Sequence, residues 1–284
     1  MTSAGAAVGR LVVCATPIGN LEDVTLRVLA ALREADVLAC EDTRHTRGLL
    51  ERHGIEQKLV SYHEHNERAR AAELLTRMRA GEVVALVSDA GMPLISDPGF
   101  ALVRACIEAD VPVEVLPGAS AVLSALVASG IPAECWRFVG FLPRKAAERG
   151  RLLERAEEVL VAYESPRRLA ATLEQLAGFD PERPLAVCRE LTKLHEEVRR
   201  GTAAELAEHY AENAPRGEVV LVVGAAAGTS DDLAAGRADA LAALRELVEA
   251  GARPRPAAKA VSKLTGIAAN ELYGQLMNDA SGGS

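Results

Sequence analysis

The residues of this sequence best suited to chemistry stand in short polar groups that directly follow apolar runs. Val83–Val87 is a run of β-branched and small apolar residues, followed at once by Ser88, Asp89, Ala90 and Gly91. The polar residues Glu41 to His45 follow the run DVLAC in the same way. Carboxylates beside a glycine that lets a ligand approach the backbone could bind a small ligand or transfer protons. A plain polar turn between a strand and a helix has similar weight on composition alone.

Strands and helices must position these groups, and the first half of the chain has the pattern for both. Apolar runs at 10–15, 36–40, 58–62, 83–87 and 111–116 are typical of buried strands, and helix-spaced apolar residues separate them. The alternation predicts a mainly parallel sheet, in which the loops TPIGN, EDTRH, YHEHN, SDAGMP and PGAS share one edge. Open α/β sheets bind ligands at that edge. We expect Thr43 to cap the helix after the second loop, and Asp97 and Pro98 to begin the helix after the fourth.

The second half of the chain has a different pattern and predicts a mixed α/β layer. Strand-like segments occur at 136–142, 159–163 and 185–188 and in GEVVLVVG, with a basic helical segment after the first of them. We therefore predict an N-terminal α/β domain at 1–118, a second α/β domain at 119–228 and a helical extension at 229–284. The extension has a helix-turn-helix shape, for which nucleic-acid contact and a small capping bundle are equally supported.

Composition excludes several classes of protein. The 284 residues are 49% hydrophobic and contain no apolar run of the roughly 20 residues that span a bilayer. The first residues lack the pattern of a signal peptide, so we expect a soluble cytoplasmic protein. Five scattered cysteines without a CxxC pair argue against disulfides or a zinc ribbon and favour buried thiols. A formal net charge of −8 disfavours non-specific coating of nucleic acid, although a local basic face remains compatible with it.

Several familiar sites are absent or weakly supported. The sequence has no Walker loop, no G-x-G-x-x-G after the first strand and no G-x-S-x-G elbow. His63 and His65 could share one face of a strand, but no third metal ligand has a recognisable spacing, so we predict no metal site. From the residues alone, a small-ligand site between two α/β domains remains, with acids and arginines near it.

Eight motifs, in order along the chain, resemble one family. They are CATPIGNLEDVTLRVLAAL, EDTRHTRGLL, YHEHNE, VALVSDAGMPLISDPG, LPGASA, GFLPRK, YESPRRL and CRELTK. This series resembles the tetrapyrrole-methylase-like (class III) methyltransferases, and within them the enzymes that methylate the ribose 2′-oxygen of a cytidine in 16S rRNA. The resemblance covers residues 11–224, and residues 251–277 fit the C-terminal helical extension of these enzymes. Met92 and Cys188 depart from the family pattern, where Thr and Ala are expected.

The resemblance implies a fold, a cofactor and partners. It implies two αβα domains that hold S-adenosylmethionine in the cleft between them, a homodimer, and 16S rRNA of the small ribosomal subunit as substrate. By position in the motifs, the implied cofactor contacts are Pro17, Gly19, Asp89, Ala90, Gly91, Pro117, Gly118, Ser120 and Ala121. Phe141, Tyr163, Leu191, Gly217 and Glu218 are weaker contacts carried over from the second domain.

The implied reaction needs few catalytic groups. A carboxylate that accepts the proton of the 2′-hydroxyl would help, and Glu41, Asp42 and Glu190 are our candidates. Arg44 and Lys193 are also among the predicted catalytic residues, and their expected role is to bind RNA phosphates. The predicted RNA-binding residues, which form a basic track, are Arg144, Lys145, Arg167, Arg168 and Arg189. Two alternatives stay open: a class III enzyme that acts on a tetrapyrrole or a protein side chain, and a regulator that binds S-adenosylmethionine without catalysis.

Overall fold

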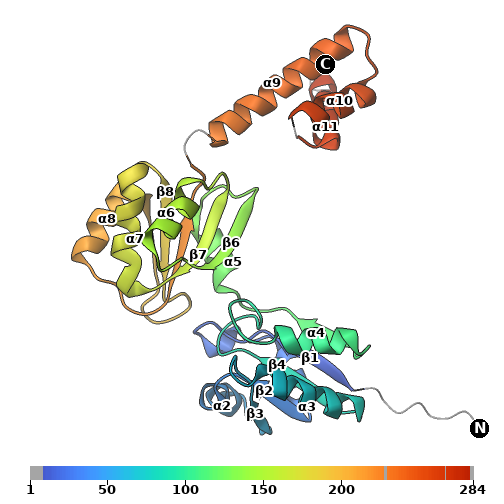
Figure 1. Ribbon diagram of the computed structural model, residues 1–284, viewed down its shortest axis with the longest axis vertical. Coiled ribbons are helices and arrows are strands. Elements are labelled where there is room, and N and C mark those ends of the chain that lie inside the picture. Colours follow the sequence, from blue (N-terminus) through green and yellow to red (C-terminus); the bar gives the residue numbers. More distant parts are fainter. Residues whose placement is uncertain (1–8, 227–228, 266, 282–284) are drawn as a thin grey trace, which may run out of the picture. The chain divides into compact units, whose positions relative to one another are not determined.

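The computed structural model describes residues 9–226, 229–265 and 267–281 (Figure 1). It divides into one compact unit of residues 1–153 and 158–224 and a second of residues 154–157 and 225–284. Both predicted sheets lie in the first unit, so the proposed boundary between residues 118 and 119 stays a prediction.

The first sheet is entirely parallel, as the apolar runs predict. Its strands are β1 (Arg10–Cys14), β2 (Val37–Cys40), β3 (Leu59–Ser61), β4 (Val83–Val87) and β5 (Val113–Leu116), in the order β3-β2-β4-β1-β5. Residue 85 of β4 lies opposite Val12 of β1 and Leu38 of β2. All loops after these strands therefore leave from one edge of the sheet.

Helices cover both faces of this sheet, which explains why its strands are apolar throughout. Helices α1 (Leu26–Glu34) and α2 (Thr43–Arg52) pack with alternate strand residues such as Val12 and Leu38. Helices α3 (Glu67–Arg79) and α4 (Phe100–Glu108) belong to the core on the other face, with Leu11 and Leu86.

Two of the predicted helix starts are wrong. Asp42, not Thr43, caps α2, and its carboxylate accepts a hydrogen bond from the Arg44 amide. Helix α4 begins one residue after Gly99, which occupies the cap position with φ +142°, a value typical of glycine. The amides of Gly99 and Ala101 donate instead to Glu67 Oε1 at 3.2 and 3.0 Å. Glu67 therefore takes the role expected of Asp97.

The predicted second α/β half contains a sheet that combines parallel and antiparallel strand pairs. Its strands are β6 (Trp136–Phe141), β7 (Val159–Glu164), β8 (Pro184–Arg189), β9 (Glu197–Thr202) and β10 (Val219–Val223), in the order β6-β7-β10-β8-β9. Only β6 and β7 pair in parallel. Helix α5 (Ala121–Ser129) packs against one face, and α8 (Ala203–Glu212) contacts β8 and β9. Helices α6 (Ala146–Glu154) and α7 (Pro166–Phe179) complete this half (Figure 1).

The second unit is a small helical cluster. Its helices are α9 (Thr229–Glu249), α10 (Pro254–Thr265) and α11 (Ala269–Ser281), which share a core that includes Leu244, Val261 and Leu272. The Arg255 guanidinium lies 5.3 Å from the centre of the Tyr273 ring. Packing of the three helices agrees with the predicted bundle, and contact with nucleic acid stays a prediction.

Two further expectations can be compared with the fold. Cys14, Cys40, Cys106 and Cys188 are buried free thiols as predicted, whereas Cys135 is exposed. None of the helices in the described ranges has the length and apolar character needed to cross a membrane.

Candidate functional site

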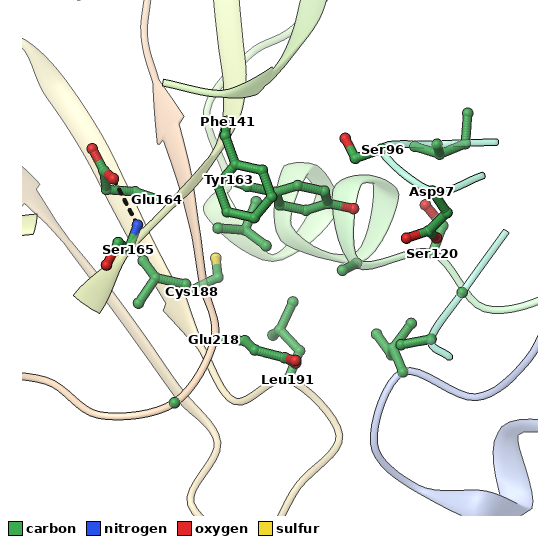
Figure 2. A pocket seen from close by; sticks show the side chains of 18 of the residues that line it. Ser96, Asp97, Ser120, Phe141, Tyr163, Glu164, Ser165, Cys188, Leu191 and Glu218 are labelled. Carbon is green, nitrogen blue, oxygen red and sulfur yellow. Dashed lines mark hydrogen bonds between the residues drawn. The ribbon is translucent and has the colours of Figure 1, made fainter. Parts of the chain in front are cut away.

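A cavity of about 410 Å³ collects most of the predicted cofactor residues (Figure 2). Its walls come from the loops after β1, β4 and β5 and from the residues at the ends of β6, β7, β8 and β10. The predicted residues that line it are Ala90, Gly91, Ser120, Ala121, Phe141, Tyr163, Leu191, Gly217 and Glu218. Five others, Pro17, Gly19, Asp89, Pro117 and Gly118, lie outside the lining. The loops at the carboxyl ends of the strands and the positions of the motifs therefore both point to this cavity.

Backbone hydrogen bonds tie together two of the loops of the first sheet. The Thr16 amide donates to the Gly91 carbonyl at 2.8 Å, and the Gly91 amide donates to the Thr16 carbonyl at 3.1 Å. Gly91 has φ +80°, and a Cβ there would lie 3.3 Å from Ile18 Cγ2. Glycine is therefore needed both for the turn and for the space beside the cavity.

The loop after β1 also contacts the RELTK segment of the second half. The Asn20 amide donates to Thr192 Oγ1 at 3.0 Å, and a Cβ on Gly19 would lie 2.5 Å from Lys193 Cγ. Lys193 Nζ donates to Glu190 at 3.0 Å and to Glu218 at 2.8 Å. The Glu218 amide and Lys193 lower the pKa of Glu190. The predicted catalytic pair Glu190 and Lys193 therefore forms an ion-pair cluster with Glu218, which lines the cavity.

Aromatic rings form part of the wall that the second sheet contributes. The Tyr163 ring lies 5.1 Å from Phe138 and 5.3 Å from Phe141, measured between ring centres. Phe141 is 62% exposed, whereas Tyr163 is half-buried. Burial raises the pKa of the Tyr163 hydroxyl, with further contributions from Asp97 and Glu218. Tyr163 is therefore protonated at neutral pH and available as a hydrogen-bond donor.

The two carboxylates of the polar loop after β2, Glu41 and Asp42, have different surroundings. Asp42 Oδ2 accepts a hydrogen bond from Arg44 Nη2 at 2.8 Å, and Arg44 lowers the pKa of Asp42. The Asp42 amide donates to Asp89 Oδ1 at 3.0 Å. Glu41 has a raised pKa because it is partly buried and lies near Asp89. Neither Glu41 nor Asp42 lines the cavity.

Comparison with known proteins adds an independent line of evidence. The sequence pattern of the family described as Tetrapyrrole (Corrin/Porphyrin) Methylases matches residues 10–207, which include both sheets up to β9. The chain belongs to the tetrapyrrole methylase family. The expected α/β fold of the tetrapyrrole methylase type, with two sheets and a C-terminal helical extension, is confirmed by this membership and by the structure.

Two relatives that align over most of this chain carry the same name. The ribosomal RNA small subunit methyltransferase I of Mesorhizobium japonicum is 45% identical over 96% of this chain and 93% of its own length. The protein of the same name from Synechocystis is 42% identical over 93% of this chain and 96% of its own. The family resemblance inferred from the motifs is therefore confirmed.

Solved structures of the family have the same fold. A uroporphyrin-III-C-methyltransferase from Thermus thermophilus aligns with a TM-score of 0.54 and 28% identity, over 76% of this chain and 94% of its own. A second structure of that name from the same organism was solved in complex with S-adenyl homocysteine and aligns with a TM-score of 0.53 at 22% identity, over 76% of this chain and 97% of its own.

Asp97 is one of the cavity residues that were not among the predicted site residues. Asp97 lines the cavity beside Ser96, after a turn in which Leu94 and Ser96 have positive φ values of 73° and 68°. Burial, with smaller contributions from Glu41 and Asp89, raises the pKa of Asp97 to about 6. The sequence assigned Asp97 to a helix cap, and the only contrary signal was Gly99 two residues later.

The predicted RNA-binding residues fall into two groups. Arg144, Lys145 and Arg167 are exposed. Arg168 instead forms an ion pair with Glu164, whose side chain is fully buried, and donates to the Leu142 carbonyl. Arg189 is paired with Glu197 at 2.9 Å. Lys145, although exposed, is paired with Glu148 at 3.0 Å. Arg144 and Arg167 therefore present the most accessible basic side chains of the five.

No metal centre emerges from the described part of the chain. None of its clusters of His, Cys, Asp and Glu contains three side chains placed to hold a metal ion. The rings of His63 and His65 lie 5.9 Å apart, and the Asn66 amide group contacts His63.

Proposed function

We propose that this protein transfers the methyl group of S-adenosylmethionine to the ribose 2′-oxygen of a cytidine in 16S rRNA. The observation that carries this proposal is the identity of 45% over 96% of the chain with a ribosomal RNA small subunit methyltransferase I. The 2′-oxygen and the cytidine come from the resemblance of the eight motifs. The cavity then provides a place where this reaction can occur.

The chemistry of the cavity fits S-adenosylmethionine. Its volume is within the range of small-molecule sites, and its walls combine apolar side chains with a few polar groups. The carboxylates of Asp97 and Glu218 line it and complement a ligand that carries a positive sulfonium and an ammonium group. When bound, S-adenosylmethionine supplies an activated methyl group. Ala90, Gly91, Ser120 and Ala121 would hold it from the first half, with Leu191 and Gly217 opposite them.

The remaining task of the chain is to position the ribose. In-line alignment of the 2′-oxygen with the methyl–sulfur bond supplies much of the rate in a reaction of this kind. Exposed arginines on the segments around the cavity, Arg144 and Arg167, would bind backbone phosphates without reading the sequence of the RNA. A 2′-hydroxyl requirement would restrict the enzyme to RNA.

Exposed apolar side chains support a homodimer. Val115 on the edge strand β5 is 55% exposed, and Val127 on α5 is 82% exposed. The homodimer itself comes from the resemblance of the motifs, and these side chains are available to such an interface. Light scattering coupled to size exclusion would give twice the mass of 30.0 kDa for a dimer. An rRNA substrate also favours the cytoplasm, which fractionation of expressing cells would test.

The experiment that tests the function uses small ribosomal subunits that lack the modification. Purified protein and S-adenosylmethionine are added, and nucleosides are analysed by mass spectrometry for 2′-O-methylcytidine. The expected result is one methyl group per subunit, and an RNA fragment with 2′-deoxycytidine at the target position should accept none. Absence of the product, or transfer to a tetrapyrrole or a protein instead, would contradict the proposal.

A further inference from the structure

A second cavity of about 400 Å³ lies in the second α/β half and shares no lining residue with the cavity that collects the predicted cofactor residues. It is formed by the end of β8, by β9, by the last turns of α8 and by the segment that joins α8 to β10. Three of its residues are arginines, Arg189, Arg199 and Arg216, and Glu197 is the only acid among its described lining residues. We call it the arginine pocket.

The register of β9 explains why these side chains meet. Val198 packs against the core to which α5 belongs, so its neighbours Glu197 and Arg199 point to the opposite face of the sheet. Arg189 is the partner of Glu197 in the antiparallel pair of β8 and β9, and such partners lie on the same face. Helix α8 packs against both strands and brings Tyr210 to the same place. The fold therefore gathers two arginines, a glutamate and a tyrosine beside one another.

Positive charge is in excess in the arginine pocket. Glu197 pairs with Arg189 at 2.9 Å and with Arg199 at 3.3 Å. The exposed Arg216 has no ion-pair partner among the described residues. A single carboxylate thus faces three guanidinium groups. The negative end of α8 carries only about half an elementary charge and does not cancel this excess. The arginine pocket is therefore suited to an anion.

A buried hydroxyl without a partner supports the same conclusion. Tyr210 is 2% exposed, and its hydroxyl makes no hydrogen bond of normal geometry with any described residue. Burial, with a smaller contribution from Glu197, raises the pKa of this hydroxyl to about 12, although Arg199 and Arg189 act in the opposite direction. The hydroxyl therefore lies among the charged groups of the arginine pocket and stays protonated at neutral pH. A buried donor of this kind costs free energy unless a ligand accepts its hydrogen bond.

The arginine pocket adjoins the wall of the first cavity along the chain. Arg216 directly precedes Gly217 and Glu218, which line that cavity. The Arg216 carbonyl accepts a hydrogen bond from Arg189 Nη1 at 3.4 Å, and the Glu190 amide donates to the Glu218 carbonyl at 3.0 Å. An anionic group held at Arg216 therefore lies close to the place where a ribose must be presented. This proximity favours a phosphate of the substrate over an unrelated anion.

A phosphate group also matches the donors. Arginine binds phosphate oxygens through charge-assisted hydrogen bonds, and a tyrosine hydroxyl donates to the same oxygens. We propose that the arginine pocket binds a phosphodiester group of the RNA substrate through Arg199, Arg216 and Tyr210. This inference rests on the proposed function for the identity of the RNA. Arg189 keeps its pair with Glu197 and holds β8 and β9 together. The bound phosphate fixes the path of the RNA strand beside the first cavity and carries no sequence preference.

The first test removes the two exposed charges together. We expect Arg199→Gln with Arg216→Gln to weaken the binding of unmodified small ribosomal subunits, measured by filter binding, by about 10-fold or more. Over about 50 to 200 mM salt, the slope of log affinity against log salt should become shallower by about 0.7 to 1, the contribution of one phosphate. The affinity for S-adenosylmethionine, measured by calorimetry, should stay unchanged, because neither residue lines the first cavity.

Arg79→Gln is the matched control for the charge. Arg79 is exposed at the C-terminal end of α3, at the opposite edge of the first sheet from the loops that lead to the first cavity. Its loss should leave the affinity for RNA and the salt slope unchanged. An equal loss in Arg79→Gln and in the double variant would mean that only the overall charge matters, and the inference would be wrong.

Tyr210→Phe separates binding of a ligand from a structural role. Because the hydroxyl has no partner in the free protein, Tm should stay unchanged or rise, while the affinity for RNA should fall by about 3- to 10-fold. Tyr62→Phe provides the comparison, since that hydroxyl has a partner in Glu67 and its loss should lower Tm. A lower Tm with unchanged affinity for RNA in Tyr210→Phe would make the hydroxyl structural and remove it from the proposed site.

The remaining outcomes distinguish the ligand and the function. Unchanged affinity and salt slope in the double variant would overturn the inference. If inorganic phosphate raises the Tm of the wild type but not of the double variant, and both bind RNA equally, the arginine pocket is a site for a free anion and the proposal is wrong. If the wild type binds subunits as expected but makes no 2′-O-methylcytidine, only the proposed function fails. If the wild type methylates and the double variant has a normal KM and salt slope, only this inference fails.

Discussion

The loops that follow β2 and β4 both place an aspartate just before a helix, and they use it in opposite ways. After β2, Asp42 caps α2 and pairs with Arg44, so its charge is neutralised and its side chain serves the fold. After β4, Asp97 neither caps α4 nor forms a pair with a cation in the described part of the chain, and it lines the cavity. The same residue type in the same sequence context thus has a structural role in one loop and faces the cavity in the other.

The cause of this difference lies outside both loops. Glu67 at the start of α3 accepts the amides of Gly99 and Ala101, and the same oxygen also accepts the Tyr62 hydroxyl at 3.3 Å. Once a residue from another helix satisfies the first turn of α4, Asp97 is released from that role. An aspartate that precedes a helix is left out of the cap when the first amides of that helix have a partner elsewhere.

Of the variants that test this contrast between the two loops, Gly99→Ala should have the largest effect on stability and activity. An alanine at φ +142° is strained, and its Cβ would lie 2.8 Å from Leu94 Cδ1 and 3.0 Å from Leu86 Cδ2. We expect a loss of about 2 kcal/mol or more in the free energy of unfolding, together with lower activity as Asp97 moves. Urea denaturation measures the first effect and the methylation assay the second.

Gly48→Ala provides the control for that variant. Gly48 lies inside α2, and a Cβ there would meet no atom within 4 Å. The substitution should therefore stabilise the protein by about 0.5–1 kcal/mol, because alanine is the better helix residue. Equal destabilisation by the two substitutions would show that the conformation of Gly99 does not matter.

Glu67→Ala should cause the next largest loss of stability. It removes the carboxylate that accepts the first amides of α4 in place of Asp97. Two helix amides and the buried Tyr62 hydroxyl would lose their partner, at a cost of about 2 kcal/mol. Glu108→Ala, which removes only an exposed pair with Arg104, should cost less than about 0.5 kcal/mol. Thermal unfolding of both variants at one pH makes the comparison, and similar melting temperatures would contradict the capping role of Glu67.

Much of the fold could be read from the sequence, and the exceptions have physical reasons. The apolar runs of β1, β2 and β4 predict strands because both faces of the first sheet are covered by helices. Strand β9 was not predicted, because Glu197–Thr202 is a polar edge strand without an apolar run. It forms through pairing with β8 rather than through burial. The predicted caps, Thr43 and Asp97, differ by one and two residues from the observed cap positions at Asp42 and Gly99. Neighbouring polar residues are equally plausible caps from the sequence alone.

The candidate site shows the same limit at the level of single residues. Motif positions select Gly91, Ser120 and Tyr163, and all three line one cavity. Asp97 was missed because Asp-Pro before an apolar helix has the same pattern as a cap, and only the long-range contact with Glu67 removes it from that role. Local sequence predicts which residues lie at the edge of the sheet where the strands end. It does not predict which of them already have hydrogen-bonding partners there.

Asp42→Ala tests the other loop, and its effect should be smaller. It removes the cap of α2 and the pair with Arg44, so the melting temperature should fall. Because Asp42 does not line the cavity, kcat/KM should stay close to that of the wild type. Asp42→Asn, which retains a capping oxygen, should recover most of the lost stability. A large loss of kcat in both variants would instead support the predicted catalytic role of the loop after β2.

The smallest expected effect is also the most specific, because it depends on the sign of one pKa shift. The pKa of Asp97 in the folded protein, about 6, lies above its ordinary value, so the stabilising contribution of the neutral acid is lost as pH rises through 6. Asp97→Asn cannot ionise, and it should match the wild type near pH 4 and be more stable at pH 8. Solvent screening of this half-buried group limits the gain to about 1 kcal/mol, or roughly 3 °C in Tm. A difference in Tm that is independent of pH would mean that Asp97 is an ordinary carboxylate, and the contrast between the two loops would then disappear.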